Sequence, residues 1–128
     1  MNRKELIQFR MKVWTAYHAP GNPHYCKRKR NAVFISPANS LEHEVGKLIV
    51  CYVLREKGRD FISEAVSNST GLRHDVVDLD YNMKWEVEKT SKRAERFKGV
   101  KDVIVLPLWK LEGLSEIVRW VEDNIGYG

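Results

Sequence analysis

Two adjacent segments with the alternating pattern of β-strands, residues 73–80 and 83–90, constrain the fold more than any other feature of this sequence. Only Tyr81 and Asn82 separate them, which is the length of a tight hairpin loop, and Asn tolerates the positive φ that such loops require. A hairpin forces its two strands to pair as antiparallel neighbours. The sequence therefore predicts a fold organised around a sheet that contains these two strands.

Carboxylates of this hairpin are expected to gather on one face. Because side chains alternate between the two faces of a strand, Asp75 shares a face with Val77. Glu86 and Glu88 share a face of the second strand for the same reason. Counting back from a two-residue loop places Asp75 opposite Glu88, and it places Val77 opposite Glu86. Like charges directly opposite one another are unfavourable without a cation, so the pattern predicts either a solvated acidic face or a cation site.

Length and composition favour one globular domain with an anionic partner. A chain of 128 residues, 43% hydrophobic and 30% charged, is long enough for one hydrophobic core. Its net charge of +5 favours nucleic acid or a membrane surface as partner. Cys26 and Cys51 make no disulfide framework and suit a reducing compartment. Since no apolar run is long enough for a signal peptide or a membrane span, we expect an intracellular protein without a membrane partner.

The first forty residues predict a helix and then a basic loop. Apolar residues at helical spacing place the helix over residues 3–17, and the loop covers residues 18–31. Within it, the run at residues 27–30 is expected to contact phosphate or to be simply solvated. The same loop holds three residues that match no common zinc spacing and lack an obvious fourth ligand: His18, His24 and Cys26. Residues 31–35 are a candidate short strand.

A strong helix is predicted from Ser40, its N-cap, through Lys57, with Gly58 as the stop signal. The residues expected to form its buried stripe are Leu41, Val45, Leu48, Ile49, Tyr52 and Val53. Glu44 lies at the edge of this stripe, where an acid is unusual unless it is paired or binds a cation. The alternative is an ion pair within the helix, to Lys47 at position i+3.

The remaining segments complete an α/β pattern. A strand is expected over residues 60–67, a basic helix after residue 90, a buried strand over residues 102–106 and a last helix over residues 113–124. From Ser40 the order is helix, three strands, helix, strand, helix. A helix between the third and fourth strands implies a crossover, and hence a parallel pair within a mixed sheet.

This order of elements resembles the core of the PD-(D/E)xK nuclease superfamily, which includes restriction endonucleases and archaeal Holliday-junction resolvases. The family has an acid in the first core helix, an Asp on the second strand and an acid-x-Lys on the third. Glu44, Asp75 and the run Glu86-Val87-Glu88 occupy these positions, with Glu88 where the family usually has Lys. The resemblance covers residues 40–108 of a single nuclease-like domain. Residues 1–39 add an N-terminal helix and basic loop, and residues 109–128 add a C-terminal helix.

The resemblance implies a restriction-endonuclease-like αβββαβ core and an endonuclease that hydrolyses DNA phosphodiester bonds, including those of branched or structured DNA. A divalent ion, Mg²⁺ with Mn²⁺ as substitute, activates water and stabilises the leaving oxygen in such chemistry. The implied catalytic residues are Glu44, Asp75, Glu86 and Glu88. The implied metal ligands are Asp75, Glu86, the Val87 carbonyl and Glu44. The expected DNA contacts are Lys27, Arg28, Lys29, Arg30, Lys92, Arg93 and Arg96. A homodimer is also implied, because such enzymes cut both strands.

The Glu at position 88 leaves two interpretations of activity open. Some members of the family carry Glu at this position and remain active. The alternative is a catalytically silent module that binds nucleic acid on a nuclease scaffold. A third interpretation, an acidic-faced protein-interaction domain, explains the carboxylates of the hairpin but not the basic helix beside them.

Overall fold

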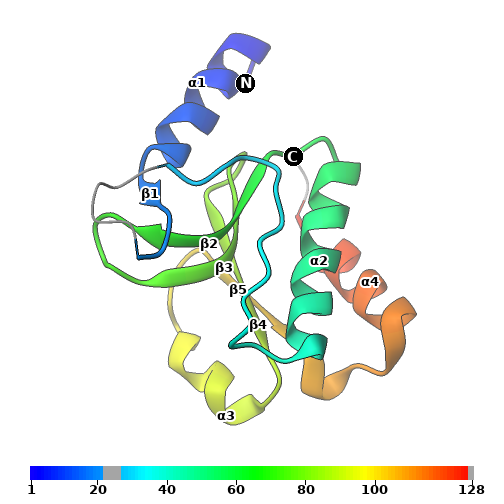
Figure 1. Cartoon of the computed structure of the whole chain (residues 1–128). Helices are drawn as coiled ribbons and strands as arrows, with labels where there is room; N and C mark the ends of the chain where they lie inside the picture. Colours follow the sequence, from blue (N-terminus) through cyan, green and yellow to red (C-terminus); the bar gives the residue numbers. More distant parts are fainter. Residues whose placement is uncertain (22–26, 127–128) are drawn as a thin grey trace.

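The computed structural model of the chain describes residues 1–21 and 27–126. Within them, five strands form one mixed sheet in the order β1-β2-β3-β4-β5 (Figure 1). The strands are β1 (Tyr17–His18), β2 (Phe61–Ser67), β3 (Arg73–Asp78), β4 (Met83–Glu88) and β5 (Val103–Pro107). The helices are α1 (Arg3–Trp14), α2 (Leu41–Glu56), α3 (Ser91–Ala94) and α4 (Gly113–Asn124), with 3₁₀ turns η1 (Glu95–Phe97) and η2 (Leu108–Lys110). The predicted α/β class is confirmed.

The crossover that makes the sheet mixed was also correctly predicted. Strands β1 to β4 pair antiparallel with their neighbours, whereas β4 and β5 are parallel. The chain passes through α3 and η1 between these two strands, as a parallel connection requires. Residues 31–35 were predicted as a strand but form none. Backbone groups of this segment make hydrogen bonds to a side chain of β2 instead of forming a strand ladder. Ser63 Oγ accepts a hydrogen bond from the Phe34 N–H and donates one to the Ala32 carbonyl.

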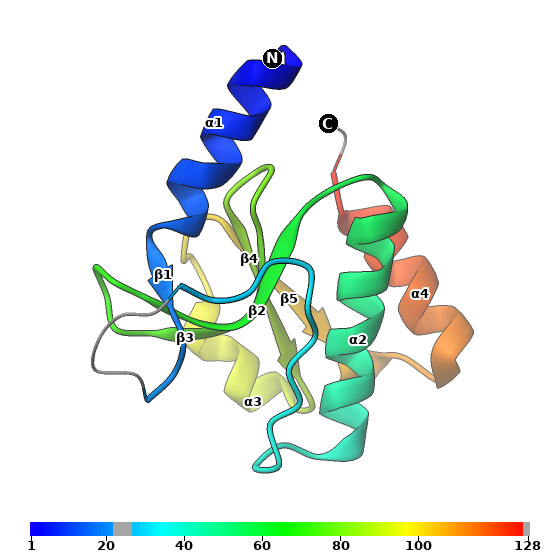
Figure 2. The same ribbon diagram turned by 45° about the horizontal axis from the view of Figure 1, so that its top comes forward.

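Two hydrophobic layers lie on opposite faces of the sheet. Helices α2 and α4 cover one face side by side, where Val76, Trp85 and Val87 contribute to the core (Figures 1 and 2). On the other face Val13 of α1 packs with Val77 and its neighbours. Helix α1 ends at Trp14, three residues earlier than predicted, since Tyr17 instead pairs with Ser67 in the edge strand β1. The ends of α2 follow the sequence signals: the Ser40 hydroxyl caps it, and Gly58 takes a φ of +73°.

The face of α2 that turns toward the sheet differs from the predicted stripe. Three of the residues expected to be buried are exposed: Leu41, Leu48 and Tyr52. The buried face instead includes Gly46, Lys47, Val50 and Leu54. Gly46 allows the helix to approach β4 closely, because a Cβ added there would lie only 2.9 Å from Cγ1 of Val87. Lys47 is fully buried because ion pairs compensate its charge. The spacing of apolar residues cannot reveal burial of this kind.

We predict that Gly46→Ala destabilises the protein by about 1–3 kcal/mol through overpacking, although Ala favours a helix by about 1 kcal/mol. Val87→Ala removes the opposing methyl, so the double variant should be less destabilised than the two single variants sum to. Urea unfolding of the three proteins measures this coupling. Leu48→Ala, on the exposed side of α2, is the control and should change stability by less than about 0.5 kcal/mol. Strict additivity would show that Gly46 does not set the packing distance.

Candidate active site

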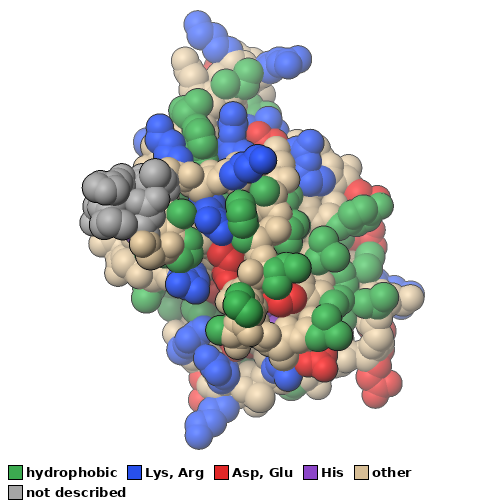
Figure 3. Space-filling model, in the orientation of Figure 1, with side chains coloured by type: hydrophobic (Ala, Val, Ile, Leu, Met, Phe, Trp, Pro, Cys, Tyr) green, Lys and Arg blue, Asp and Glu red, His purple; other side chains and the backbone are tan. Residues whose placement is uncertain are grey.

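A cleft of about 830 Å³ opens where β3 begins, β4 ends and α2 begins. Its walls carry four acids: Glu64, Asp75, Glu86 and Glu88. Four basic residues also line it, and all four are exposed: Arg73, Lys89, Arg93 and Arg96. Figure 3 shows acidic side chains near the middle of the face that it presents, with Lys and Arg side chains gathered near them over α3. The cleft therefore combines buried and half-buried carboxylates with a cationic rim.

Pairing between β2 and β3 is interrupted at one point beside the cleft. The ladder is regular at positions 63 and 65 of β2, but Glu64 and Asp75, which lie between, do not pair. Glu64 has a φ of +48°, the left-handed region that residues other than Gly seldom occupy. Its carboxylate points toward α2, where it lies 3.7 Å from Nζ of Lys47.

This interruption also turns Asp75 toward α2. His74, on one side of Asp75, packs its ring against Tyr17 on the α1 face of the sheet. Val77 belongs to the hydrophobic cluster of that same face. Asp75 instead contacts His43 of α2, and Val76 lies in the core beneath α2. The expectation that Asp75 shares a face with Val77 is therefore wrong, because strict alternation fails where the ladder is broken.

The hairpin register differs from the prediction by two residues. The loop covers residues 79–82 instead of two residues, and Val77 lies opposite Lys84 instead of Glu86. Continuing this register places Asp75 opposite Glu86, and not opposite Glu88. The longer loop forms because Asp78 accepts a hydrogen bond from the Asp80 N–H, a local turn that ends the strand.

Glu44 is fully occupied by hydrogen bonds within the protein. Its carboxylate accepts from Lys47 Nζ at 2.5 Å, from Asn39 Nδ2 at 2.8 Å and from the Ser36 N–H at 3.2 Å, and it also contacts the His43 ring. Burial alone would raise the pKa of Glu44, but these bonds, led by that of Lys47, lower it to about 2. The ion pair to Lys47, one of the two sequence interpretations of Glu44, is confirmed.

Asp75 is held between α2 and β4. Its Oδ2 lies 3.2 Å from Nε2 of His43 and accepts a hydrogen bond of 2.7 Å from the Val87 N–H. Burial opposes a charge on the His43 ring, yet the contacts to Asp75 and Glu44 raise the pKa of His43 overall. Within the described residues, Oδ1 of Asp75 accepts no hydrogen bond, so this oxygen remains open to a ligand.

Glu86 and Glu88 lie on the opposite face from Trp85 and have different partners. Glu86 is buried, and its Oε1 lies 3.0 Å from Nδ1 of His74. Burial raises the pKa of Glu86 to about 7, although the contact with His74 acts in the other direction. Glu88 is buried as well and accepts a hydrogen bond of 2.9 Å from Arg96, with Arg93 at 3.8 Å.

The predicted DNA-contacting residues are divided between two places. Arg93 and Arg96 line the cleft, and Lys92 is exposed nearby on α3. None of residues 27–30 lines the cleft, and Arg28 is partly used by the fold, since its guanidinium stacks on the Phe34 ring at 3.6 Å. Sequence reasoning missed Arg73 and Lys89 at the rim. Their position at the very ends of the two acidic strands is the signal that could have identified them.

No ready-made metal cage exists in the part of the chain that the structure describes. Among residues 1–21 and 27–126, no group of three or more His, Cys, Asp or Glu is placed to hold a metal ion. Of the predicted ligands, Asp75, Glu86 and Val87 line the cleft, whereas the carboxylate of Glu44 is occupied by its hydrogen bonds. The loop residues His24 and Cys26 lie outside the described residues.

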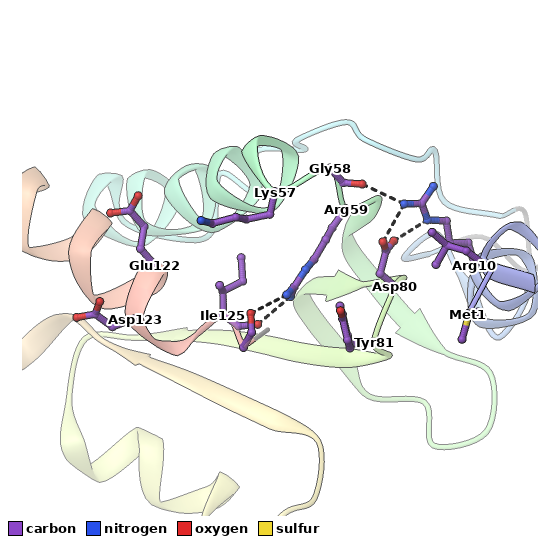
Figure 4. A pocket seen from close by; sticks show the side chains of 12 residues that line it. Met1, Arg10, Lys57, Gly58, Arg59, Asp80, Tyr81, Glu122, Asp123 and Ile125 are labelled. Carbon is purple, nitrogen blue, oxygen red and sulfur yellow. Dashed lines mark hydrogen bonds and ion pairs between the residues drawn. The ribbon is translucent and has the colours of Figure 1, made fainter. Parts of the chain in front are cut away.

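A second pocket, of about 660 Å³, lies at the opposite end of α2 and contains none of these acids. Its two central guanidinium groups are already paired (Figure 4). Arg59 donates to Asp78 and to the Ile125 carbonyl, at 3.0 and 2.7 Å. Arg10 donates to Asp80 at 2.7 Å. These contacts join α1 and the end of α4 to the hairpin, so we assign this pocket a structural role.

Comparison with protein-family models, with curated proteins and with solved structures gave no match. None of the described helices is long and apolar enough to cross a membrane. The interpretation of the cleft therefore depends on its own geometry.

We predict that Glu86 makes the metal-free protein less stable as the pH rises toward 7. Its pKa is raised from 4.5 to about 7 in the folded state, so the folded protein holds a proton that the unfolded chain releases. This stabilisation is present below pH 4.5 and is lost as the pH rises through 7; at about 1.4 kcal/mol per pKa unit it amounts to up to about 3 kcal/mol. Glu86→Gln should flatten this decline in urea unfolding measured with EDTA between pH 5 and 8.

Glu56→Gln is the control for that experiment. Glu56 is exposed at the end of α2 far from the cleft, so its loss does not change the surroundings of Glu86. Glu56→Gln should leave the slope between pH 5 and 8 as in the wild type. If Glu86→Gln leaves the decline as steep as in the wild type, Glu86 is ionised in the folded protein at neutral pH.

Proposed function

We propose that this chain is a divalent-metal-dependent endonuclease that hydrolyses phosphodiester bonds of DNA. The observation that supports this function best is the cleft itself, in which Asp75 and Glu86 on neighbouring strands lie below an exposed rim of four basic residues. Basic rims attract the phosphate backbone, whereas buried acids repel it unless a cation lies between. A cleft that contains both is suited to a phosphodiester bound through a metal ion.

The donors present fit Mg²⁺ or Mn²⁺ better than a softer metal. Mg²⁺ is commonly bound by one or two carboxylates and keeps several of its waters, so a complete protein cage is not required. Asp75 and Glu86 would hold it, with the Val87 carbonyl assisting. When bound, the ion would lower the pKa of a water and stabilise charge on the leaving oxygen. The high pKa of Glu86 is consistent with a buried acid that lacks a nearby compensating charge of this kind.

The rim would position DNA without reading its sequence. Arg73, Lys89, Arg93 and Arg96 carry flexible cationic side chains, which contact phosphate oxygens and carry no direct base information. Any preference would then depend on the shape of the DNA, which agrees with a branched or structured substrate. A homodimer that presents two such clefts would reach both strands.

A catalytically silent DNA-binding module is the second candidate, and one observation favours it. Each of the four acids predicted as catalytic is already paired with a basic side chain. The pairs are Glu44 with Lys47, Asp75 with His43, Glu86 with His74, and Glu88 with Arg96. Acids that already have partners within the protein can be accommodated without a metal ion, so DNA could bind at the rim without being cut.

Cleavage assays separate the two candidates. Plasmid, linear and four-way-junction DNA incubated with Mg²⁺ or Mn²⁺ should be cut, and EDTA should prevent it. Asp75→Asn and Glu86→Gln should abolish cutting while DNA binding persists, because each removes a ligand charge but keeps the side-chain volume. Glu56→Gln, an exposed acid at the far end of α2, should cut like the wild type. Binding without cutting under every condition would favour the silent module.

The salt dependence of binding tests the DNA path. Replacing Arg73, Lys89 and Arg93 with Ala should weaken binding to all sequences about equally. It should also reduce the slope of log K against log salt by up to about 0.9 for each phosphate of duplex DNA that the variant no longer neutralises. Arg96 is left in place because it also binds Glu88. Lys4→Ala with Lys12→Ala, on α1, removes charge away from the cleft and should leave the slope unchanged. An unchanged slope in the rim variant would move the DNA path to the loop at residues 27–30.

A further inference from the structure

One acid of the cleft, Glu64, was given no role by sequence reasoning. Only 4% of the residue is exposed, and it lines the cleft together with Asp75 and Glu86. Its Oε2 is the one buried side-chain nitrogen or oxygen in the described part of the chain that has no hydrogen-bond partner. Buried polar atoms in native proteins are nearly always paired, so an orphaned carboxylate oxygen in a cleft requires an explanation.

Lys47 compensates Glu64 only in part. The Lys47 ammonium lies 2.5 Å from Glu44 and 2.6 Å from the Phe34 carbonyl, but 3.7 Å from Oε1 of Glu64. The Lys47 ammonium is therefore committed to Glu44 first. Burial raises the pKa of Glu64, with Lys47 acting in the other direction, as expected for a carboxylate without a close partner.

The backbone places Glu64 toward the same side of the sheet as Asp75. The two residues lie opposite one another at the interruption of the ladder, and both side chains contact residues of α2. Glu86, in contrast, contacts no residue of α2 through a hydrogen bond within the described residues and is paired with His74 at 3.0 Å. Among the acids near Asp75, Glu64 is thus the one that the local backbone directs toward the same helix.

Binding an ion through Glu64 would also break fewer existing hydrogen bonds than binding it through Glu44 or Glu88. Glu44 would lose hydrogen bonds to Lys47 and Asn39, and Glu88 would lose its bond to Arg96. Among residues 1–21 and 27–126, Glu64 makes one ion pair, the long contact to Lys47. We propose that Glu64 and Asp75 together bind a divalent cation of the Mg²⁺ type on the α2 side of the cleft, with water completing its shell. Glu64 then takes the role that the resemblance assigned to Glu44, and this inference rests on the metal-dependent function proposed above.

Mn²⁺ binding in the absence of DNA tests this site directly. Electron paramagnetic resonance counts free Mn²⁺ during titration of the purified protein, so the readout does not require activity. Glu64→Gln and Asp75→Asn should each weaken Mn²⁺ binding at least tenfold. Glu44→Gln, at a carboxylate already occupied by hydrogen bonds, should weaken it far less. Glu64→Asp keeps the charge on a shorter side chain and should retain more affinity than Glu64→Gln, so the test survives if the Gln variant folds poorly.

Thermal melts provide a second, independent readout. In EDTA, Glu64→Gln should melt at or above the wild-type temperature, because it removes an incompletely compensated buried charge. The increase in melting temperature that Mn²⁺ gives the wild type should shrink in this variant.

The possible outcomes separate this inference from the proposed function. Suppose that the wild-type protein binds Mn²⁺ and that this binding requires Asp75 and Glu86 but not Glu64. The Glu64 site is then wrong, and the metal-dependent function stands. If wild type binds no Mn²⁺ and cuts no DNA, both are wrong. A Glu64→Gln protein that melts well below the wild type in EDTA and binds Mn²⁺ normally would make Glu64 a structural partner of Lys47.

Discussion

The interruption of pairing between Glu64 and Asp75 determines how charge is distributed in this molecule. A regular ladder would send both side chains to the faces that alternation assigns them, and Asp75 would then lie on the α1 side beside Val77. The left-handed conformation of Glu64 instead turns both residues toward α2. Such backbone conformations are costly for residues other than Gly, and they concentrate at functional sites. Among the described strand residues, Glu64 is the one other than Gly with a positive φ, and it forms part of the wall of the acidic cleft.

Lys47 allows the fold to tolerate this concentration of acids. A fully buried ammonium is expensive unless it is paired and hydrogen-bonded, and here it contacts a carboxylate and a backbone carbonyl within 2.6 Å. Its contact with the Phe34 carbonyl joins α2 to the loop before it, and its longer ion pair to Glu64 joins α2 to β2. Each of the four acids predicted as catalytic contacts a basic side chain, although the contact with His74 does not keep the pKa of Glu86 from rising to about 7. Glu64 differs from them in having, within the described residues, a buried carboxylate oxygen without a hydrogen bond.

The sequence predicted the positions of the helices and strands better than it predicted which of their residues are buried and how the strands of the hairpin pair. Caps and stop signals placed α2 almost to the residue, apolar residues at helical spacing placed α4 over residues 113–124, and the crossover rule gave the parallel pair of β4 and β5. The stripe of α2 was wrong at three of its six positions, and it missed Lys47 because hydrophobic periodicity treats Lys as a surface residue, whereas ion pairs bury it here. The hairpin register was wrong because the side chain of Asp78 ends β3 early. A shift of two residues preserves the faces of a strand, so the grouping of Glu86 with Glu88 survived this error.

The acids of the site could be found from sequence, but their partners could not. The acidic pattern of the hairpin pointed to Asp75, Glu86 and Glu88, and all three line the cleft, although alternation gave the wrong face for Asp75. Their actual neighbours depend on contacts between residues distant in the sequence, such as His43 with Asp75 across 32 positions. Glu64 carried no signal, because an acid within an apolar strand resembles a solvent-facing residue until a left-handed φ turns it inward. Sequence patterns assume regular backbone, and the position where this chain departs from it is also where its carboxylates meet.

The charge at position 88 illustrates why a side chain must be considered together with its neighbours. Glu88 stands where the resemblance expects Lys, which by itself would make this end of the cleft acidic. The residue is only 5% exposed, however, whereas the side chain of Arg96 bound to it is 57% exposed. Arg93 lies on the same carboxylate at 3.8 Å and is still more exposed. A buried acid covered by two guanidinium groups presents positive charge to the cleft. An approaching phosphate would therefore meet a cation at the place where the sequence shows an acid, and Glu88 would serve to fix the position of that cation.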